Sequence, residues 1–134
     1  MFKLSKKVEY GLIAVKHIAE EGKINPCSAK EISEEYKIPY ELLSKILQKL
    51  TREKILYSIQ GIKGGYKLSK KPEKISLSSV MTAIEGNSYI LDCGLHDDPG
   101  SCKIYSTCSI NNPLQKIQKG ISRFFNTTKV SEIV

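Results

Sequence analysis

Residues 28–68 constrain this chain more than any other stretch, because two helical patterns and a glycine-rich hairpin pattern follow one another there with short links. Ser28 and Glu31 have the spacing of a capping box, which predicts a helix that begins at Ser28 and continues to about Lys37. Pro39 suits the first position of a second helix, where its missing N–H costs nothing. The apolar stripe of that helix consists of Leu42, Leu43, Ile46, Leu47 and Leu50. Two helices joined by so short a turn predict a helix-turn-helix.

The sequence directly after these helices predicts a β-hairpin. Residues 56–60 and 66–68 are short β-prone runs, and the segment GIKGG at 61–65 lies between them. Glycines in such a segment permit the positive φ angles of a tight turn. A helix-turn-helix followed by a hairpin has the form of a winged helix, whose second helix enters a DNA major groove. The alternative interpretation is an ordinary helical hairpin and β-hairpin within a core.

Positive charge is concentrated in the same part of the chain. Residues 1–71 contain 15 Lys and Arg against 8 Asp and Glu, whereas residues 72–134 contain 6 of each kind. Residues 37–71 alone contain nine basic residues and two acidic ones. A basic patch on a helix-turn-helix and wing is typical of phosphate contacts, so the sequence predicts binding to double-stranded DNA. A solvated lysine-rich surface is the alternative.

We expect the N-terminal half of the second helix to lie nearest the groove. Ser44 or Glu41 would read a base edge, and the lysines would contact the phosphate backbone. The predicted DNA-binding residues are Ser28, Pro39, Tyr40, Glu41, Ser44, Lys45, Lys49, Gln60, Lys63, Gly64, Tyr66 and Lys67.

Two further helices complete the predicted head and its connection. Ser5 is expected to cap a first helix that ends near Glu21, with His17 off its inward stripe, at or near the surface, and without an assigned role. Ser76 is expected to cap a short helix that ends at Gly86. At the end of the chain, Val130, Ile133 and Val134 are expected to pack against the rest of the protein.

A last long helix, predicted at 112–126, has an apolar stripe formed by Leu114, Ile117, Ile121, Phe124 and Phe125. Such a stripe needs a covering surface, and the simplest one is a second copy of the chain in a two-fold homodimer. The alternative is that the helix folds back on its own head. The expected fold is mainly α, with a winged head at 1–71 and a unit at 72–134 that carries the short helix, a cysteine loop at 92–108 and the dimerisation helix.

Three of the four cysteines lie close together in that loop. Cys93, Cys102 and Cys108 have the spacing C-x8-C-x5-C, while Cys27 lies apart and is predicted to be a packed thiol. The chain shows no signal-peptide pattern and no membrane-spanning run, which predicts a reducing cytosolic location and cysteines that are not in disulfides. The spacing favours an iron-sulfur cluster first, structural zinc second and a thiol-disulfide switch third.

A cluster held by three cysteines needs a fourth ligand or an open iron site. His96 and Asp92 lie in the same loop, Asn111 follows the last cysteine by three residues, and Glu9 could arrive from a partner subunit. The sequence shows no nucleophile–base constellation and no phosphate-binding glycine motif, so we expect neither an enzyme nor a small-molecule substrate.

The order of these elements, the wing sequence GIKGGYKL, the three cysteines and the ending TTKVSEIV resemble the IscR/NsrR-type bacterial regulators of the Rrf family. The resemblance covers nearly the whole chain. It implies a homodimeric winged-helix transcription factor, a repressor or dual regulator, that binds a 2Fe–2S or 4Fe–4S cluster and senses cluster, iron, redox or nitric oxide status. Regulators of the nitric oxide type take their fourth ligand from a first-helix acid of the other subunit, and Glu9 falls at that position. Regulators of cluster assembly use a histidine where this chain has Asn111.

Two alternatives remain. The first is a cluster-free regulator that resembles the cysteine-metabolism repressor of the same family. It would act through zinc, a thiol switch or a partner protein. The second alternative is a small iron-sulfur redox carrier whose winged fold mediates protein contacts. Specific operator binding separates a regulator from a carrier, because a carrier would bind DNA weakly and without sequence preference.

Overall fold

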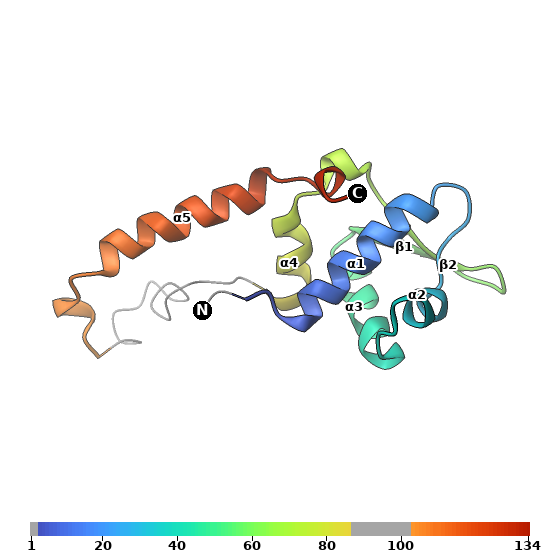
Figure 1. Cartoon of the computed structure of the whole chain (residues 1–134), viewed down its shortest axis with the longest axis horizontal. Coiled ribbons are helices and arrows are strands. Elements are labelled where there is room, and N and C mark those ends of the chain that lie inside the picture. Colours follow the sequence, from blue (N-terminus) through green and yellow to red (C-terminus); the bar gives the residue numbers. More distant parts are fainter. Residues whose placement is uncertain (1–2, 87–102) are drawn as a thin grey trace.

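The computed structural model describes residues 3–86 and 103–134, which form helices and one two-stranded sheet (Figure 1). The helices and strands are α1 (Lys6–Glu21), α2 (Ala29–Tyr36), α3 (Tyr40–Arg52), β1 (Leu56–Ile59), β2 (Gly65–Leu68), α4 (Leu77–Glu85) and α5 (Asn111–Thr127). Short 3-10 turns are η1 (Pro72–Lys74), η4 (Tyr105–Thr107) and η5 (Val130–Glu132). The predicted mainly α fold with a small hairpin is confirmed.

Three serines begin helices as predicted. The hydroxyl oxygens of Ser5, Ser28 and Ser76 accept hydrogen bonds from the backbone N–H three residues later, at 3.0 to 3.2 Å. Each such cap contributes about 1 kcal/mol by satisfying a donor that the first turn leaves unpaired. Pro39 differs by one position from the prediction, because it precedes α3 as its N-cap residue instead of opening the helix.

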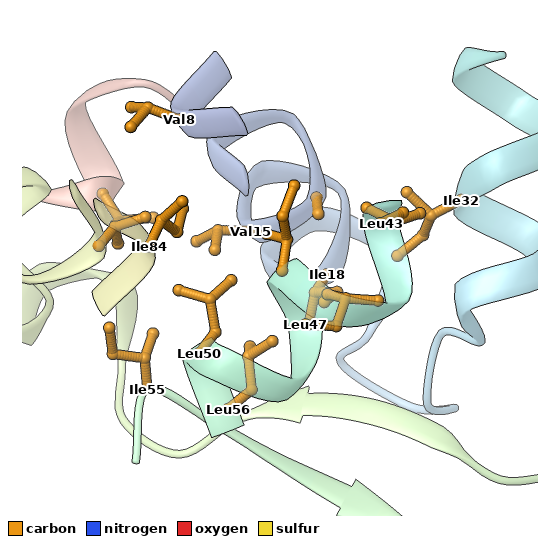
Figure 2. Close-up of a cluster of buried hydrophobic side chains, with 14 of the residues drawn as sticks. Val8, Val15, Ile18, Ile32, Leu43, Leu47, Leu50, Ile55, Leu56 and Ile84 are labelled. Atoms are coloured by element: carbon orange, nitrogen blue, oxygen red, sulfur yellow. The ribbon is translucent and has the colours of Figure 1, made fainter. Parts of the chain in front are cut away.

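The core lies where α1, α3 and α4 meet, and Figure 2 shows its side chains pointing toward one another. The predicted stripe of α3 faces this core: Leu43, Ile46, Leu47 and Leu50 are buried, and Leu42 is half-buried. From α4, Val80 and Ile84 enter the same core, so the short helix packs into the head although it follows the wing in sequence.

The wing is an antiparallel pair in which Leu56 pairs with Leu68 and Ile59 with Gly65. Gly64 stands where a Cβ atom would lie 2.1 Å from the carbonyl oxygen of Ile59, so the tight turn admits only glycine there. Strand β2 also joins the segment before α2. The N–H of Cys27 donates to the carbonyl of Tyr66 at 3.1 Å, and the N–H of Tyr66 donates back at 2.8 Å.

Helix α5 extends away from the head, and its C-terminal end is the part tied to it (Figure 1). The N–H of Leu77 donates to the carbonyl of Thr128 at 2.9 Å, the side chains of Ser78 and Asn126 are hydrogen-bonded, and Phe125 packs against the core. Along the rest of the helix the predicted stripe is only partly covered in the described chain: Ile117 is 51% exposed and Phe124 is 63% exposed, whereas Leu114 and Ile121 are half-buried.

The end of the chain packs only in part as predicted. Val130 is fully buried beside Ile75, and Ile133 contacts the core. Val134 is 49% exposed, so the prediction that it packs was wrong; the 3-10 turn η5 directs Val130 and Ile133 inward and ends before Val134. Among the described residues, no helix combines the length and the apolar character needed to cross a membrane.

Candidate nucleic-acid interface

The turn between α2 and α3 is built from residues 37–39. Lys37 adopts the left-handed conformation with φ 56°, which ends α2, and the next residues turn the chain into α3. Ser33 fixes this turn, because its hydroxyl donates to the carbonyl of Ile38 at 2.8 Å and its own carbonyl accepts from the Ile38 N–H. Ile38 is itself buried, which anchors the turn in the core. The helix-turn-helix geometry is therefore held by both backbone and side-chain bonds.

The outer surface of α3 carries the predicted groove-facing residues. Tyr40, Glu41 and Lys45 are exposed, and Ser44 is half-buried beside them. Burial of the Tyr66 hydroxyl, with a smaller contribution from Tyr40, raises the pKa of Tyr66. Helix α3 also packs against strand β1, so the wing lies beside this helix.

Several predicted contact residues already have partners within the protein. Ser28 caps α2, the ammonium of Lys49 donates to the carbonyl of Ile84 at 3.1 Å, and that of Lys67 donates to the carbonyl of Ile24 at 3.0 Å. Tyr66 is half-buried against the core. Pro39, Gln60 and Lys63 are exposed, and Gly64 is partly buried in the turn. Lys45 and Lys63 are thus the exposed lysines of the predicted set.

One residue of the wing was missed by the sequence analysis. Ile62 at the wing tip is fully exposed, next to Lys63. An exposed isoleucine at the tip of a hairpin is suited to apolar contact with a base edge in a DNA groove. The signal was its place between two turn glycines, where a residue cannot reach the core.

The residues predicted to bind a cluster are only partly described. Glu9 lies in the first turn of α1, partly exposed, and forms an ion pair with Lys6 at 3.0 Å. Cys108 follows η4 as a partly exposed free thiol. Asn111 begins α5 and is buried, with its Oδ1 atom accepting from Gln115 Nε2 at 2.6 Å. The other predicted ligands, Cys93, Cys102, His96 and Asp92, lie outside the described residues.

The position of Glu9 relative to Cys108 bears directly on the ligand prediction. Helix α1 and the η4 turn are widely separated along the long axis of the molecule (Figure 1). Glu9 belongs to the first of these elements, and Cys108 directly follows the second.

A second group of side chains was not predicted as a site. His17 is 8% exposed, so the expectation of a surface or half-buried position was wrong: the packing of α2 and of the segment before it covers this face of α1. The His17 Nδ1 atom lies 2.9 Å from the Tyr36 hydroxyl, and its Nε2 atom lies 3.1 Å from Glu31 Oε2. The Glu31 carboxylate thus contacts His17, whereas the capping-box pattern would direct it toward Ser28.

Cys27 belongs to the same group and is packed, as predicted. It is 2% exposed, and burial, followed by the nearby Glu31 carboxylate, raises the pKa of its thiol to about 11. The sequence signal was weak, because His17, Cys27 and Glu31 are spaced like no common metal motif. Only packing of α2 on α1 brings them together.

Comparison with known proteins agrees with this geometry. The Rrf2 family model, described as iron-dependent transcriptional regulator, matches residues 4–134. The chain belongs to the Rrf2 family. Regulators of this family bind DNA, so the chain is a DNA-binding transcriptional regulator of bacterial type and not an enzyme, as predicted.

Two relatives are similar to this chain over nearly its whole length. The transcriptional regulator NsrR of Shouchella clausii is 24% identical over 131 residues, covering 98% of this chain and 87% of that protein. The regulator IscR of Vibrio campbellii is 25% identical over 132 residues, covering 98% and 77%. The structure of CymR, the global cysteine regulator of B. subtilis, has a TM-score of 0.74 at 21% identity and covers 99% and 96%, which shows a shared fold.

Proposed function

We propose that this Rrf2-family chain is a cytosolic homodimeric repressor or dual regulator whose DNA affinity depends on an iron-sulfur cluster, of the 2Fe–2S or 4Fe–4S type. The observation that carries the proposal is the geometry of α5, which extends from the head with Ile117 and Phe124 exposed and with Cys108 just before its first turn. In this division of labour, residues 1–71 bind the operator and residues 72–134 hold the cluster and the dimer interface.

The exposed stripe of α5 supports the homodimer. Ile117 and Phe124, seven residues apart, lie on one face of the helix, and Ile110, the N-cap residue, precedes Ile117 by another seven; each is more than half exposed. Leaving three large apolar side chains in water forgoes about 1.5–3 kcal/mol each compared with full burial. A second α5 in a two-fold arrangement covers this face with the same residues, because a two-fold interface pairs a surface with itself.

The donor set supports the cluster. Thiolates are the preferred ligands of iron-sulfur clusters, and Cys108 is a free, partly exposed thiol at the end of the segment that also contains Cys93 and Cys102. Glu9 of the partner subunit would supply the fourth ligand, because within one chain α1, which carries Glu9, lies away from the η4 turn that precedes Cys108 (Figure 1). His96 and Asn111 are the weaker candidates for that position. A bound cluster would supply a redox-sensitive and gas-reactive iron centre.

A ligand from the partner would couple the cluster to DNA binding. Glu9 lies at the start of α1, and α1 packs directly on α3, the helix that presents Tyr40, Glu41 and Lys45. Loss of the cluster would free one head from the other subunit and change the spacing between the two α3 helices of the dimer. The DNA affinity would then differ between the protein with the cluster and the protein without it, because the two have different dimer geometries.

The decisive experiment measures iron and acid-labile sulfide per chain in protein prepared without oxygen. The triple variant Cys93→Ala, Cys102→Ala, Cys108→Ala should lose both, and Cys27→Ala is the matched control that should retain both, because Cys27 is buried in the head. Protein that holds neither iron nor sulfide after reconstitution would be a cluster-free regulator acting through zinc, a thiol switch or a partner. Only the DNA-binding half of the proposal would then stand.

Mixed dimers test whether Glu9 acts across the interface. One chain carries Glu9→Ala with all its cysteines, and the other carries the triple cysteine change with Glu9 intact. If the ligand comes from the partner, this heterodimer has one complete site and should hold a cluster with wild-type stability to chelators. If it behaves like the Glu9→Ala homodimer, the ligand does not come from the partner.

The dimer interface has its own test. Ile117→Glu should convert the protein to a monomer in sedimentation experiments with an unchanged circular dichroism spectrum, because Ile117 is half exposed in the described chain. Lys119→Gln is the control, since it alters net charge by the same amount on the opposite side of α5. A dimer that survives Ile117→Glu would place the interface elsewhere.

A further inference from the structure

Three side chains with different metal-binding atoms meet at the junction of α1, α2 and the segment that joins them. His17 offers an imidazole nitrogen, Cys27 a sulfur and Glu31 a carboxylate oxygen, and these atoms lie within 4.8 Å of one another. Tetrahedral coordination at bond lengths of about 2.0–2.3 Å requires ligand atoms about 3.3–3.8 Å apart. The His17 Nε2 and Glu31 Oε2 atoms, 3.1 Å apart, lie slightly closer together than that and would have to separate a little. A modest inward movement of the sulfur would complete the three-ligand geometry.

The burial of the three residues suits an ion that enters from one side. Cys27 is 2% exposed and His17 is 8% exposed, whereas the Glu31 side chain is 53% exposed. The sulfur and nitrogen form the inner wall, and the carboxylate closes the outer side next to solvent. Water would supply the fourth ligand from this side, as in zinc sites that have three protein ligands.

Tyr36 orients the histidine as an outer-shell partner does in known metal sites. Its hydroxyl lies 2.9 Å from His17 Nδ1, and the two rings meet edge to face with centroids 5.4 Å apart. A hydroxyl can either donate or accept, so Tyr36 accommodates both tautomers of the imidazole. With a proton on Nδ1 donated to Tyr36, the Nε2 lone pair is free to bind a cation.

The backbone around Cys27 is fixed. Two hydrogen bonds join Cys27 to Tyr66 of the wing, and a Cβ atom on Gly65 would lie 2.6 Å from the Cys27 carbonyl carbon and oxygen. Ser28, the next residue, caps α2 and so fixes the helix that carries Glu31. The three ligands are thus held by α1, α2 and the wing before any ion binds.

We propose that His17, Cys27 and Glu31 bind one borderline-soft divalent cation of the zinc class, with water at the fourth position. Nitrogen, thiolate and carboxylate together are a zinc-type donor set. Binding replaces the thiol proton of Cys27 with the cation, so one S–H bond breaks, one metal–sulfur bond forms and one proton passes to the buffer. The imidazole proton moves from Nε2 to Nδ1, which leaves the histidine neutral.

An ion at this site would connect the parts of the DNA-binding surface. It would link α1 to the first turn of α2, and through the backbone of Cys27 it would act on strand β2 of the wing. Because a ligand that binds only the folded state stabilises it, the cation should raise the melting temperature. This site is separate in the chain from the proposed cluster ligands, so each proposal can fail without the other.

The test uses the full chain with Cys93, Cys102 and Cys108 changed to Ala, which removes the other thiol ligands and retains this site. Co²⁺ is titrated as a spectroscopic probe, and Zn²⁺ is then added as competitor. We expect one Co²⁺ per chain with a thiolate-to-cobalt charge-transfer band, its displacement by Zn²⁺, and release of one proton in calorimetry with buffers of different ionisation enthalpy.

Variants assign the ligands. Cys27→Ala should abolish the charge-transfer band, and Glu31→Gln, which keeps the backbone cap to Ser28, should weaken binding at least about 10-fold. Tyr36→Phe should weaken binding by about 10–100-fold through loss of the partner of His17. Should Cys27→Ala fail to fold, Glu31→Gln and Tyr36→Phe decide the question, since Glu31 and Tyr36 lie at the surface, where substitution disturbs the core less.

Two results would overturn the proposal. One is the absence of a saturable charge-transfer band in the folded triple variant. The other is Co²⁺ binding that is equally tight in Glu31→Gln and Tyr36→Phe, which would place the ion elsewhere. Should the triple variant itself not fold, Zn²⁺ stoichiometry is compared between wild type and Cys27→Ala. A difference of one ion per chain supports the site, and equal stoichiometry refutes it.

Discussion

Gly65→Ala should detach the wing from the segment that precedes α2. The added Cβ would lie 2.6 Å from the carbonyl carbon and oxygen of Cys27 and 2.9 Å from the nitrogen of Ser28. All three are backbone atoms, so no side chain can rotate away to make room. Strand β2 would have to move, and the two hydrogen bonds between Cys27 and Tyr66 would be lost.

The magnitude follows from those contacts. Two backbone hydrogen bonds contribute about 0.5–1.5 kcal/mol each, and forcing an extra methyl group into a packed site costs about 1–3 kcal/mol. Since the two costs describe the same displacement in part, we expect a loss of about 2–4 kcal/mol in unfolding free energy. For a chain of this length that corresponds to a fall in melting temperature of about 10 °C.

The assay is urea and thermal unfolding followed by circular dichroism, together with hydrogen exchange at the amides of Cys27 and Tyr66. Gly61→Ala is the matched control in the same wing: it also has a positive φ, of 112°, but no atom lies within 4 Å of its added Cβ. It should show backbone strain alone and keep both amides protected. Equal destabilisation and equal protection in the two variants would refute the argument from the Cys27 contact.

Two further predictions concern the wing. Lys63→Ala should reduce the slope of log affinity against log salt for an operator by about 0.9 per lost phosphate contact, or about two for a dimer, whereas exposed Lys74→Ala on η1 should leave the slope unchanged. Tyr66→Phe tests the raised pKa of that hydroxyl. Because the folded state holds this proton more tightly than the unfolded state does, the stabilisation is full below pH 10 and is lost as the pH rises further. The difference in unfolding free energy between wild type and Tyr66→Phe should therefore be constant below pH 10 and decline above it; a constant difference would contradict the pKa shift.

Much of the fold was predictable because its determinants are local. A serine hydroxyl finds its N–H three residues away, so Ser5, Ser28 and Ser76 mark helix starts without reference to the rest of the chain. The apolar stripe of α3 was equally predictable, since side chains spaced by three and four residues lie on one face of a helix. The boundaries differed by a residue at Pro39 and at the ends of the wing strands, where single hydrogen bonds decide the assignment.

The sequence predicted which residues form the candidate DNA surface, but not which of them already have hydrogen-bond partners within the protein. Lys49 and Lys67 are basic residues in the expected elements, yet their ammonium groups bond carbonyls of Ile84 and Ile24, which are distant in sequence. No periodicity reveals such a partner.

By itself, the sequence determined the helix starts, the helix-turn-helix and its wing, the concentration of positive charge, and the family to which the chain belongs. These features follow from residues close together in sequence, because their spacing determines local hydrogen bonds and which side chains share a face of a helix or strand. Tertiary structure alone decided that His17 is buried against Tyr36 and Glu31, that Cys27 is fixed by the wing, and that α5 leaves Ile117 and Phe124 exposed. Each of those depends on contacts between segments far apart in the chain, whose distances only the packed fold sets.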